Sequence, residues 1–184
     1  MERSRSQHRE SVDYSRRIVI LLCIVTSACF VWIWAKKPVL TLDDALAKYK
    51  HNRQDYPPLH AAIDARDDDA ALVMLGGGVD PSEVDDDGST AMHWAAEDGM
   101  VSVVDAILAS KYHRILINFQ NQFGSTPLHK AARYNHHEIL ARLLQHPQIE
   151  VNEKDAFEWT PLKYALNHGN TEAVQLLRRH GGLV

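Results

Sequence analysis

Histidine is the residue type in this chain that could take part in the widest range of chemistry. Eleven histidines occur among the 184 residues, and an imidazole can bind a metal ion or transfer protons near neutral pH. The run His136-His137-Glu138 resembles the start of a zinc deaminase site, which a cysteine pair must complete. The chain has two cysteines, Cys23 and Cys29, and both precede residue 30. The sequence therefore predicts neither a cysteine-based zinc site nor a disulfide framework beyond that point.

A second candidate for chemistry is the acidic turn Asp85-Asp86-Asp87-Gly88, which resembles part of a calcium-binding loop. Trp94 occupies the place where such a loop needs its bidentate glutamate, so the match fails. The sequence contains no phosphate-binding glycine loop and no Gly-x-Ser-x-Gly element. We therefore expect no catalytic residue, no metal and no cofactor, and predict that the protein is not an enzyme.

The composition is that of a folded protein with an uneven charge distribution. Hydrophobic residues make up 45% and charged residues 24%, which excludes a mainly disordered or fibrous chain. The net charge of −4 divides into +5 for residues 1–54, −11 for residues 55–98 and +2 for residues 99–184. The strongly acidic middle block disfavours nucleic acid as a partner.

An apolar run over residues 18–35 predicts a transmembrane helix. As a helix it would be about 27 Å long, close to the thickness of the bilayer hydrocarbon. Arg16 and Arg17 precede the run, and Lys36 and Lys37 follow it. We expect an uncleaved signal anchor at 18–35, after a basic N-terminal arm at 1–17 and before a linker and capping helix at 36–51.

A cleaved signal peptide is the competing interpretation of this run. The small residues before Cys29 resemble a lipoprotein cleavage box, and Ser15-Arg16-Arg17 resembles a twin-arginine signal, but the apolar run continues past the cysteine. Five basic residues flank the run on the N-terminal side and four on the other, which places the N-terminus in the cytoplasm. The remainder of a single-pass membrane protein would then face outward, with the bacterial periplasm favoured.

A short motif occurs four times in residues 52–184. The segment Pro58-Leu59-His60-Ala61-Ala62 has counterparts around Met92, Leu128 and Leu162, so that successive copies are 33, 36 and 34 residues apart. Motif and period together are similar to the ankyrin repeat. The resemblance implies an all-α ankyrin-repeat solenoid with protruding β-hairpin loops, preceded by one transmembrane helix. The repeats would span approximately 52–84, 85–120, 121–154 and 155–184.

The copies follow local rules of helix formation and depart from the family at identifiable points. Thr126 and Thr41 are placed to cap helices, and Gly99 to end one. A three-residue insertion lies near Lys111–Arg114. By resemblance, the motif histidines tie neighbouring loops together through backbone hydrogen bonds; these are His60, His93 and His129. Non-glycine residues stand where the family has glycine, namely Arg66, Asn135 and Glu158.

The resemblance also implies that a protein partner binds a concave face built from hairpin tips and first helices. The candidate contact residues on that face are Asp64, Asp86, Asp87, Ser89, Glu97, Asp98, Gln122, Phe123, Ser125, Arg133, Tyr134, Phe157, Trp159, Asn167 and His168. Four of them are aromatic, and aromatic side chains are good interface anchors. For Phe157 and Trp159, packing against the adjacent hairpin is an alternative of nearly equal weight.

The acidic block adds an expectation about the partner. Its density of carboxylates favours a basic protein that associates by electrostatic attraction. The sequence thus predicts a membrane-tethered, non-enzymatic adaptor or scaffold, or an immunity-type inhibitor of a basic protein partner. No small-molecule substrate is expected. The alternative is a periplasmic stress-protection component that supports another enzyme.

Overall fold

The computed structural model describes residues 39–50 and 56–184. The predicted N-terminal arm at 1–17 and transmembrane segment at 18–35 lie outside these residues. Among the helices of the described residues, none is both long and apolar enough to cross a membrane.

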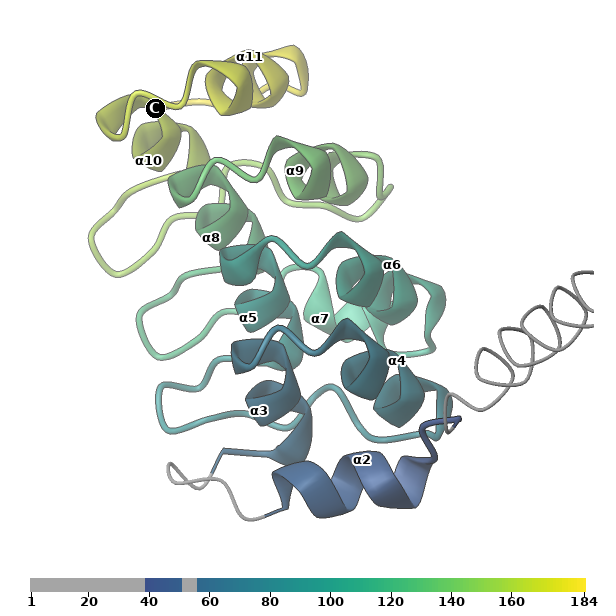
Figure 1. The fold of residues 1–184 in the computed structure, drawn as a ribbon. Coiled ribbons are helices and arrows are strands. Elements are labelled where there is room, and N and C mark those ends of the chain that lie inside the picture. Colours follow the sequence, from purple (N-terminus) through teal and green to yellow (C-terminus); the bar gives the residue numbers. More distant parts are fainter. Residues whose placement is uncertain (1–38, 51–55) are drawn as a thin grey trace, which may run out of the picture. The chain divides into compact units, whose positions relative to one another are not determined.

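Short helices in the described part of the chain alternate between two layers (Figure 1). The first layer consists of α3 (Pro58–Asp64), α5 (Ala91–Asp98), α8 (Pro127–Arg133) and α10 (Pro161–Asn167). The second layer consists of α4 (Asp68–Gly76), α6 (Val101–Ala109), α9 (His137–Leu144) and α11 (Thr171–Arg179). Each helix packs on the next helix of its own layer and on its partner in the other layer. The expected all-α stack of helix pairs is therefore confirmed.

Small and aliphatic side chains fill the space between the layers. The alanine pairs of the motif, such as Ala95–Ala96 and Ala131–Ala132, are fully buried and let the helices of a repeat approach closely. Aliphatic stripes on the second-layer helices, such as Val103, Val104 and Ile107, complete this core. These apolar faces would be exposed in an isolated repeat, so the stack stabilises each unit through its neighbours.

Two further helices depart from the regular pattern. Helix α2 (Leu42–Tyr49) covers the first repeat by packing on α3 and α4. Thr41 forms a capping box with Asp44 at the start of α2, as its hydroxyl predicts. Helix α7 (His113–Leu116) accommodates the predicted insertion as one short extra turn after α6.

The motif histidines lie in the first turn of the first-layer helices and link successive repeats. His93 Nδ1 accepts a hydrogen bond from the Thr90 backbone N–H at 3.2 Å, so its Nε2 carries the proton and donates to the Ser125 carbonyl at 2.9 Å. His129 makes the equivalent bonds to the Thr126 N–H at 3.1 Å and the Trp159 carbonyl at 3.0 Å. The predicted tie between neighbouring loops is confirmed.

His60 in the first repeat makes only half of this arrangement. Its Nε2 lies 3.0 Å from the Ser89 carbonyl oxygen, which preserves the link to the second repeat. Pro57 stands in place of the capping threonine and has no N–H to donate. Among the described residues, the buried Nδ1 of His60 consequently has no hydrogen-bond partner.

Several turns between elements require a left-handed backbone. Gly99 ends α5 with a φ of 79°, as predicted from its type. Arg66, Asn135 and Glu158, the residues that replace the family glycine, also adopt positive φ values of 52°, 61° and 60°. The backbone therefore adopts the left-handed conformation at these positions although each residue carries a Cβ, which such a conformation disfavours.

The Glu158→Gly variant is expected to raise the free energy of unfolding by about 0.5–1 kcal/mol. Removing the Cβ relieves the left-handed strain, and the greater freedom of glycine in the unfolded chain offsets part of that gain. Chemical denaturation measures the change. The control is Glu158→Gln, which keeps the Cβ and loses only an exposed 3.1 Å ion pair with Lys154, so it should have little effect. If the Glu158→Gly variant were less stable than this control, the prediction would be contradicted.

Candidate protein-binding surface

The hairpin loops and the first-layer helices lie on one side of the stack (Figure 1). We call this surface the hairpin face; it comprises the loops 85–89, 121–125 and 155–159 with helices α3, α5, α8 and α10. These loops are hairpins with little regular strand. Within the described residues, Val84 and Thr90 form an isolated antiparallel bridge.

Each hairpin is held by one buried or half-buried side chain at its first position. Asp85 Oδ1 accepts the backbone N–H groups of Asp87 at 3.0 Å and Ser89 at 2.7 Å. Asp155 does the same for Phe157 at 2.9 Å and Trp159 at 3.0 Å, and Asn121 holds the middle loop through its amide oxygen. Such side chain–backbone bonds fix a tight turn without a strand ladder. Asp85, counted from the sequence as part of an acidic surface, is therefore a structural residue of its hairpin.

Neighbouring hairpins are joined to one another by backbone hydrogen bonds. The Gln122 N–H donates to the Asp87 carbonyl at 3.0 Å, and the Ala156 N–H donates to the Phe123 carbonyl at 2.9 Å. Gly124 lies at such a crossing, where an added Cβ would come within 3.0 Å of the Ala156 nitrogen. The hairpin face is thus one connected surface, and the aromatic side chains project from a fixed frame.

Two predicted contact residues are nearly buried. Ser89 and Ser125 are only 5% and 9% exposed, because their N–H groups bond the hairpin side chains and their carbonyls accept from His60 and His93. This placement corrects the sequence-based assignment of Ser89 to the partner-facing set, whereas Ser125 still lines a cavity of this face. The backbone groups of both serines belong to the scaffold beneath the hairpin face.

The four predicted aromatic anchors keep substantial exposed area. Phe157 is 66% exposed, Phe123 48%, Tyr134 42% and Trp159 36%. Packing against neighbours, the competing expectation, applies in part to Trp159, whose ring lies edge-on to Tyr164 with centroids 5.1 Å apart. Phe157 does not fit this alternative, because its side chain projects into solvent.

A cavity of about 270 Å³ lies between two of these hairpins. We call it the aromatic pocket: Phe123, Phe157 and Tyr164 provide its apolar walls, Lys130 and Arg133 of α8 its cations, and Asn121, Ser125, His129 and Asp155 its remaining polar lining. Lys130 and Tyr164 were missed from the sequence. The signal for Lys130 was available, because residues three apart on a helix share a face and Arg133 was already a candidate.

The remaining candidates divide between paired and free charges. Lys130 Nζ lies 2.6 Å from Glu97 Oε2, and Arg66 lies 3.5 Å from Asp98. Burial would raise the pKa of Glu97, but hydrogen bonds from Lys130 and Tyr134 outweigh it and lower that pKa. Burial, followed by the hydrogen bond to Glu97, raises the pKa of Tyr134.

The hairpin face has an acidic end and a polar opposite end. Asp64, Asp86 and Asp87 are exposed at the acidic end and, among the described residues, their side chains form no ion pair. Gln122 is exposed between the ends and donates from its amide to the Asp86 carbonyl at 2.9 Å. Asn167 and His168 are exposed at the C-terminal end of α10.

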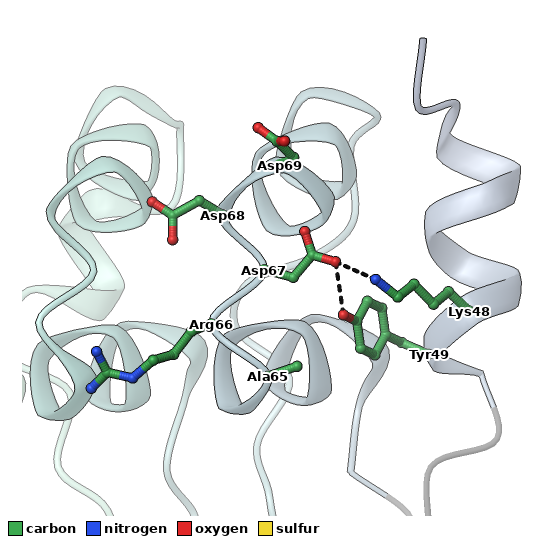
Figure 2. Close-up of a pocket in the computed structure, with 7 residues that line it drawn as sticks. All are labelled: Lys48, Tyr49, Ala65, Arg66, Asp67, Asp68 and Asp69. Carbon is green, nitrogen blue, oxygen red and sulfur yellow. Dashed lines mark hydrogen bonds and ion pairs between the residues drawn. The ribbon is translucent and has the colours of Figure 1, made fainter. Parts of the chain in front are cut away.

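The larger hollow of about 710 Å³ lies away from the hairpins, beside α2 (Figure 2). Lys48 and Tyr49 of α2 both point toward Asp67, with donor–acceptor distances of 2.6 Å and 2.8 Å to its Oδ2. The hydrogen bond from Lys48, with that from the Ala70 N–H, lowers the pKa of Asp67 despite partial burial. These contacts fasten the capping helix to the first repeat. Among the described residues, no cluster of three or more histidine, cysteine or acidic side chains could hold a metal ion.

The stacked helix pairs, the histidine ties and the linked hairpins define a repeat solenoid with one continuous surface. Residues 109–183 match the family model described as ankyrin repeats, in three copies, and form an ankyrin-repeat region. Rabankyrin-5 of Mus musculus is 29% identical over 137 residues, covering 67% of this chain and 12% of that protein. Alpha-latrotoxin-Lt1a of Latrodectus tredecimguttatus is 31% identical over 126 residues, covering 67% and 9%.

A third relative is the putative ankyrin repeat protein FPV031 of fowlpox virus, which is 36% identical over 97 residues, covering 50% of this chain and 28% of that protein. The chain spans only about a tenth of the length of the first two relatives. Ankyrin repeats imply protein–protein interaction, and proteins built from them are typically non-enzymatic.

Proposed function

We propose that this chain is a single-pass, membrane-tethered protein whose hairpin face binds a protein partner, without catalysing a reaction. It would act as an adaptor or scaffold, or as an immunity-type inhibitor of that partner. The observation that carries the proposal is the group of exposed aromatic side chains on a rigid frame, with Phe123 and Phe157 at hairpin tips and Tyr134 at the end of α8. Exposed apolar groups gathered on one face are typical of interaction sites.

The acidic end of the hairpin face supports a basic region in the partner. Asp64, Asp86 and Asp87 are exposed there. Carboxylates at an interface rim accelerate association with a cationic surface and fix its orientation. The apolar run at 18–35 supports the membrane tether, and the flanking charges support an outward-facing repeat region, with the periplasm as the proposed compartment.

The double variant Phe123→Ala/Tyr134→Ala is expected to weaken partner binding by about tenfold or more, because truncating one aromatic anchor alone often costs more than 1 kcal/mol. The experiment captures partners with the full chain from detergent-solubilised membranes of the source cells. It then measures the affinity of the purified partner for both proteins. The matched control is Ile115→Ala, which removes a 61% exposed apolar side chain from α7, outside the hairpin face.

Equal affinity of the double variant and the parent chain would refute the proposed surface. The same purified partner separates the two proposed roles. An inhibitor abolishes the partner's activity at a one-to-one ratio, whereas an adaptor leaves the partner active. Replacing Asp86 and Asp87 by asparagine should slow association with a basic partner and leave dissociation nearly unchanged.

A further inference from the structure

The aromatic pocket has the size and lining to receive one side chain of a partner. Its volume of about 270 Å³ lies below the range of pockets for whole small molecules. Phe123 and Phe157 form its walls from two successive hairpins, and these hairpins are joined by the hydrogen bond between Ala156 N–H and the Phe123 carbonyl. The backbone segments that carry the two walls are therefore joined before a partner arrives.

Three polar side chains that line the pocket, Asn121, His129 and Asp155, already have hydrogen-bond partners within the protein. Asn121 Oδ1 accepts the N–H groups of Phe123 and Ser125, each at 3.0 Å. Asp155 accepts two backbone N–H groups on Oδ1 and the Tyr164 hydroxyl on Oδ2 at 2.6 Å. His129 donates from Nε2 to the Trp159 carbonyl. A polar side chain entering the pocket would lose water and find these groups engaged, so the lining favours an apolar side chain.

The two cations of the pocket differ in whether a carboxylate of the protein already pairs with them. Lys130 is engaged by Glu97 at 2.6 Å. Arg133 lies over the Tyr134 ring at 5.4 Å and, within the part of the chain that the structure describes, has no carboxylate within ion-pair distance. Its guanidinium is exposed and can bind a carboxylate with two parallel hydrogen bonds. Asp155, the one acidic group in the lining, is 5% exposed and turned to its hairpin.

We infer that the aromatic pocket binds an apolar side chain that is adjacent to an aspartate or glutamate in the partner. The apolar group would fill the space between Phe123 and Phe157, and the carboxylate would pair with Arg133. This inference rests on the proposed function, and it adds the orientation in which the partner would lie on the hairpin face. The same partner would present basic residues to the acidic end of the hairpin face and an apolar–acidic pair to the aromatic pocket.

A phage-displayed library of random dodecapeptides tests the inference without a known partner. The full chain in detergent micelles is the immobilised target. We expect enriched peptides to contain leucine, methionine or phenylalanine beside an acidic residue. Phe157→Ala should reduce recovery of these peptides by about tenfold, the loss typical of one interface anchor. Arg133→Glu should replace the acidic neighbour by a basic one in a fresh selection.

The matched control is Arg178→Glu, which reverses an exposed charge on α11, outside the pocket, and should leave the enriched motif unchanged. Enriched peptides that lack the apolar–acidic pair, or that ignore both pocket variants, would overturn the inference. If such peptides instead depend on Asp86 and Asp87, the proposed function stands and only the pocket assignment fails. If no peptide binds the hairpin face at all, both fail.

Discussion

His93→Ala is expected to lower the free energy of unfolding by about 3–5 kcal/mol. The imidazole is fully buried and serves two repeats at once, since it accepts from the Thr90 N–H and donates to the Ser125 carbonyl. Truncation leaves both backbone groups buried and unpaired, and it leaves a cavity where the ring packs edge-on to Phe119. Each of these effects alone is worth at least about 1 kcal/mol.

Urea denaturation of the full chain in a mild detergent, followed by far-ultraviolet circular dichroism, measures this loss. The control is His137→Ala, because His137 is exposed and, among the described residues, its side chain makes a single 3.5 Å ion-pair contact, with Glu172. That substitution should change the free energy of unfolding by less than about 0.5 kcal/mol. If the two variants were equally stable, the histidine tie would not hold neighbouring repeats together.

The sequence was sufficient to predict those features that depend on repetition and on local chain geometry. Four copies of one motif predict a stack of helix pairs, because each copy carries an apolar face that only a neighbour can bury. Arg66, Asn135 and Glu158, which stand where the repeat motif has glycine, are the three non-glycine residues of the described chain that adopt positive φ, although the sequence alone suggested this only for Asn135. Thr41 likewise predicted the start of α2, since a capping hydroxyl bonds a backbone group three residues away.

The composition of the binding surface was less predictable, because it depends on bonds between residues about 30 positions apart. Ser89 and Ser125 seemed to be contact residues at hairpin positions, but histidines from the preceding repeats hold their carbonyls. Lys130 pairs with Glu97, which lies 33 residues earlier. Tyr164 reaches the pocket through its hydroxyl bond to Asp155. Periodicity places such residues on helices but does not say which distant group each will meet.

Two carboxylates of the acidic block at residues 55–98 have structural roles. Asp67 and Asp85 were counted from the sequence with the carboxylates that would attract a partner. In the structure Asp67 caps α4 and anchors α2, and Asp85 holds a hairpin and accepts from Trp94 Nε1 at 2.7 Å. Only the exposed carboxylates, such as Asp64, Asp86 and Asp87, are free to act on a partner. The attraction proposed for a basic protein therefore depends on fewer charges than the composition suggests.

The repeats are expected to lose stability as the pH falls from about 6.5 toward 4. Burial lowers the pKa of His93 to about 4, and burial also lowers the pKa of His60 and His129 below the ordinary value of 6.5. A group with a depressed pKa in the folded state binds fewer protons there than in the unfolded chain. The stabilisation is complete above pH 6.5 and declines below it, by up to about 1.4 kcal/mol per pH unit for each histidine.

Carboxylates contribute little to this decline above about pH 5, because their ordinary pKa values lie near 4. The pKa of Asp67 is lowered by its hydrogen bond from Lys48, so its contribution is present above about pH 4 and is lost only below it. The free energy of unfolding, measured by urea denaturation at intervals between pH 7 and 4, should therefore fall with a slope that His93→Gln makes clearly shallower, because it removes the buried histidine whose pKa is lowered to about 4. His137→Ala should leave the slope unchanged. A flat profile above pH 4.5, or a slope that His93→Gln does not alter, would show that the histidine ties tolerate protonation.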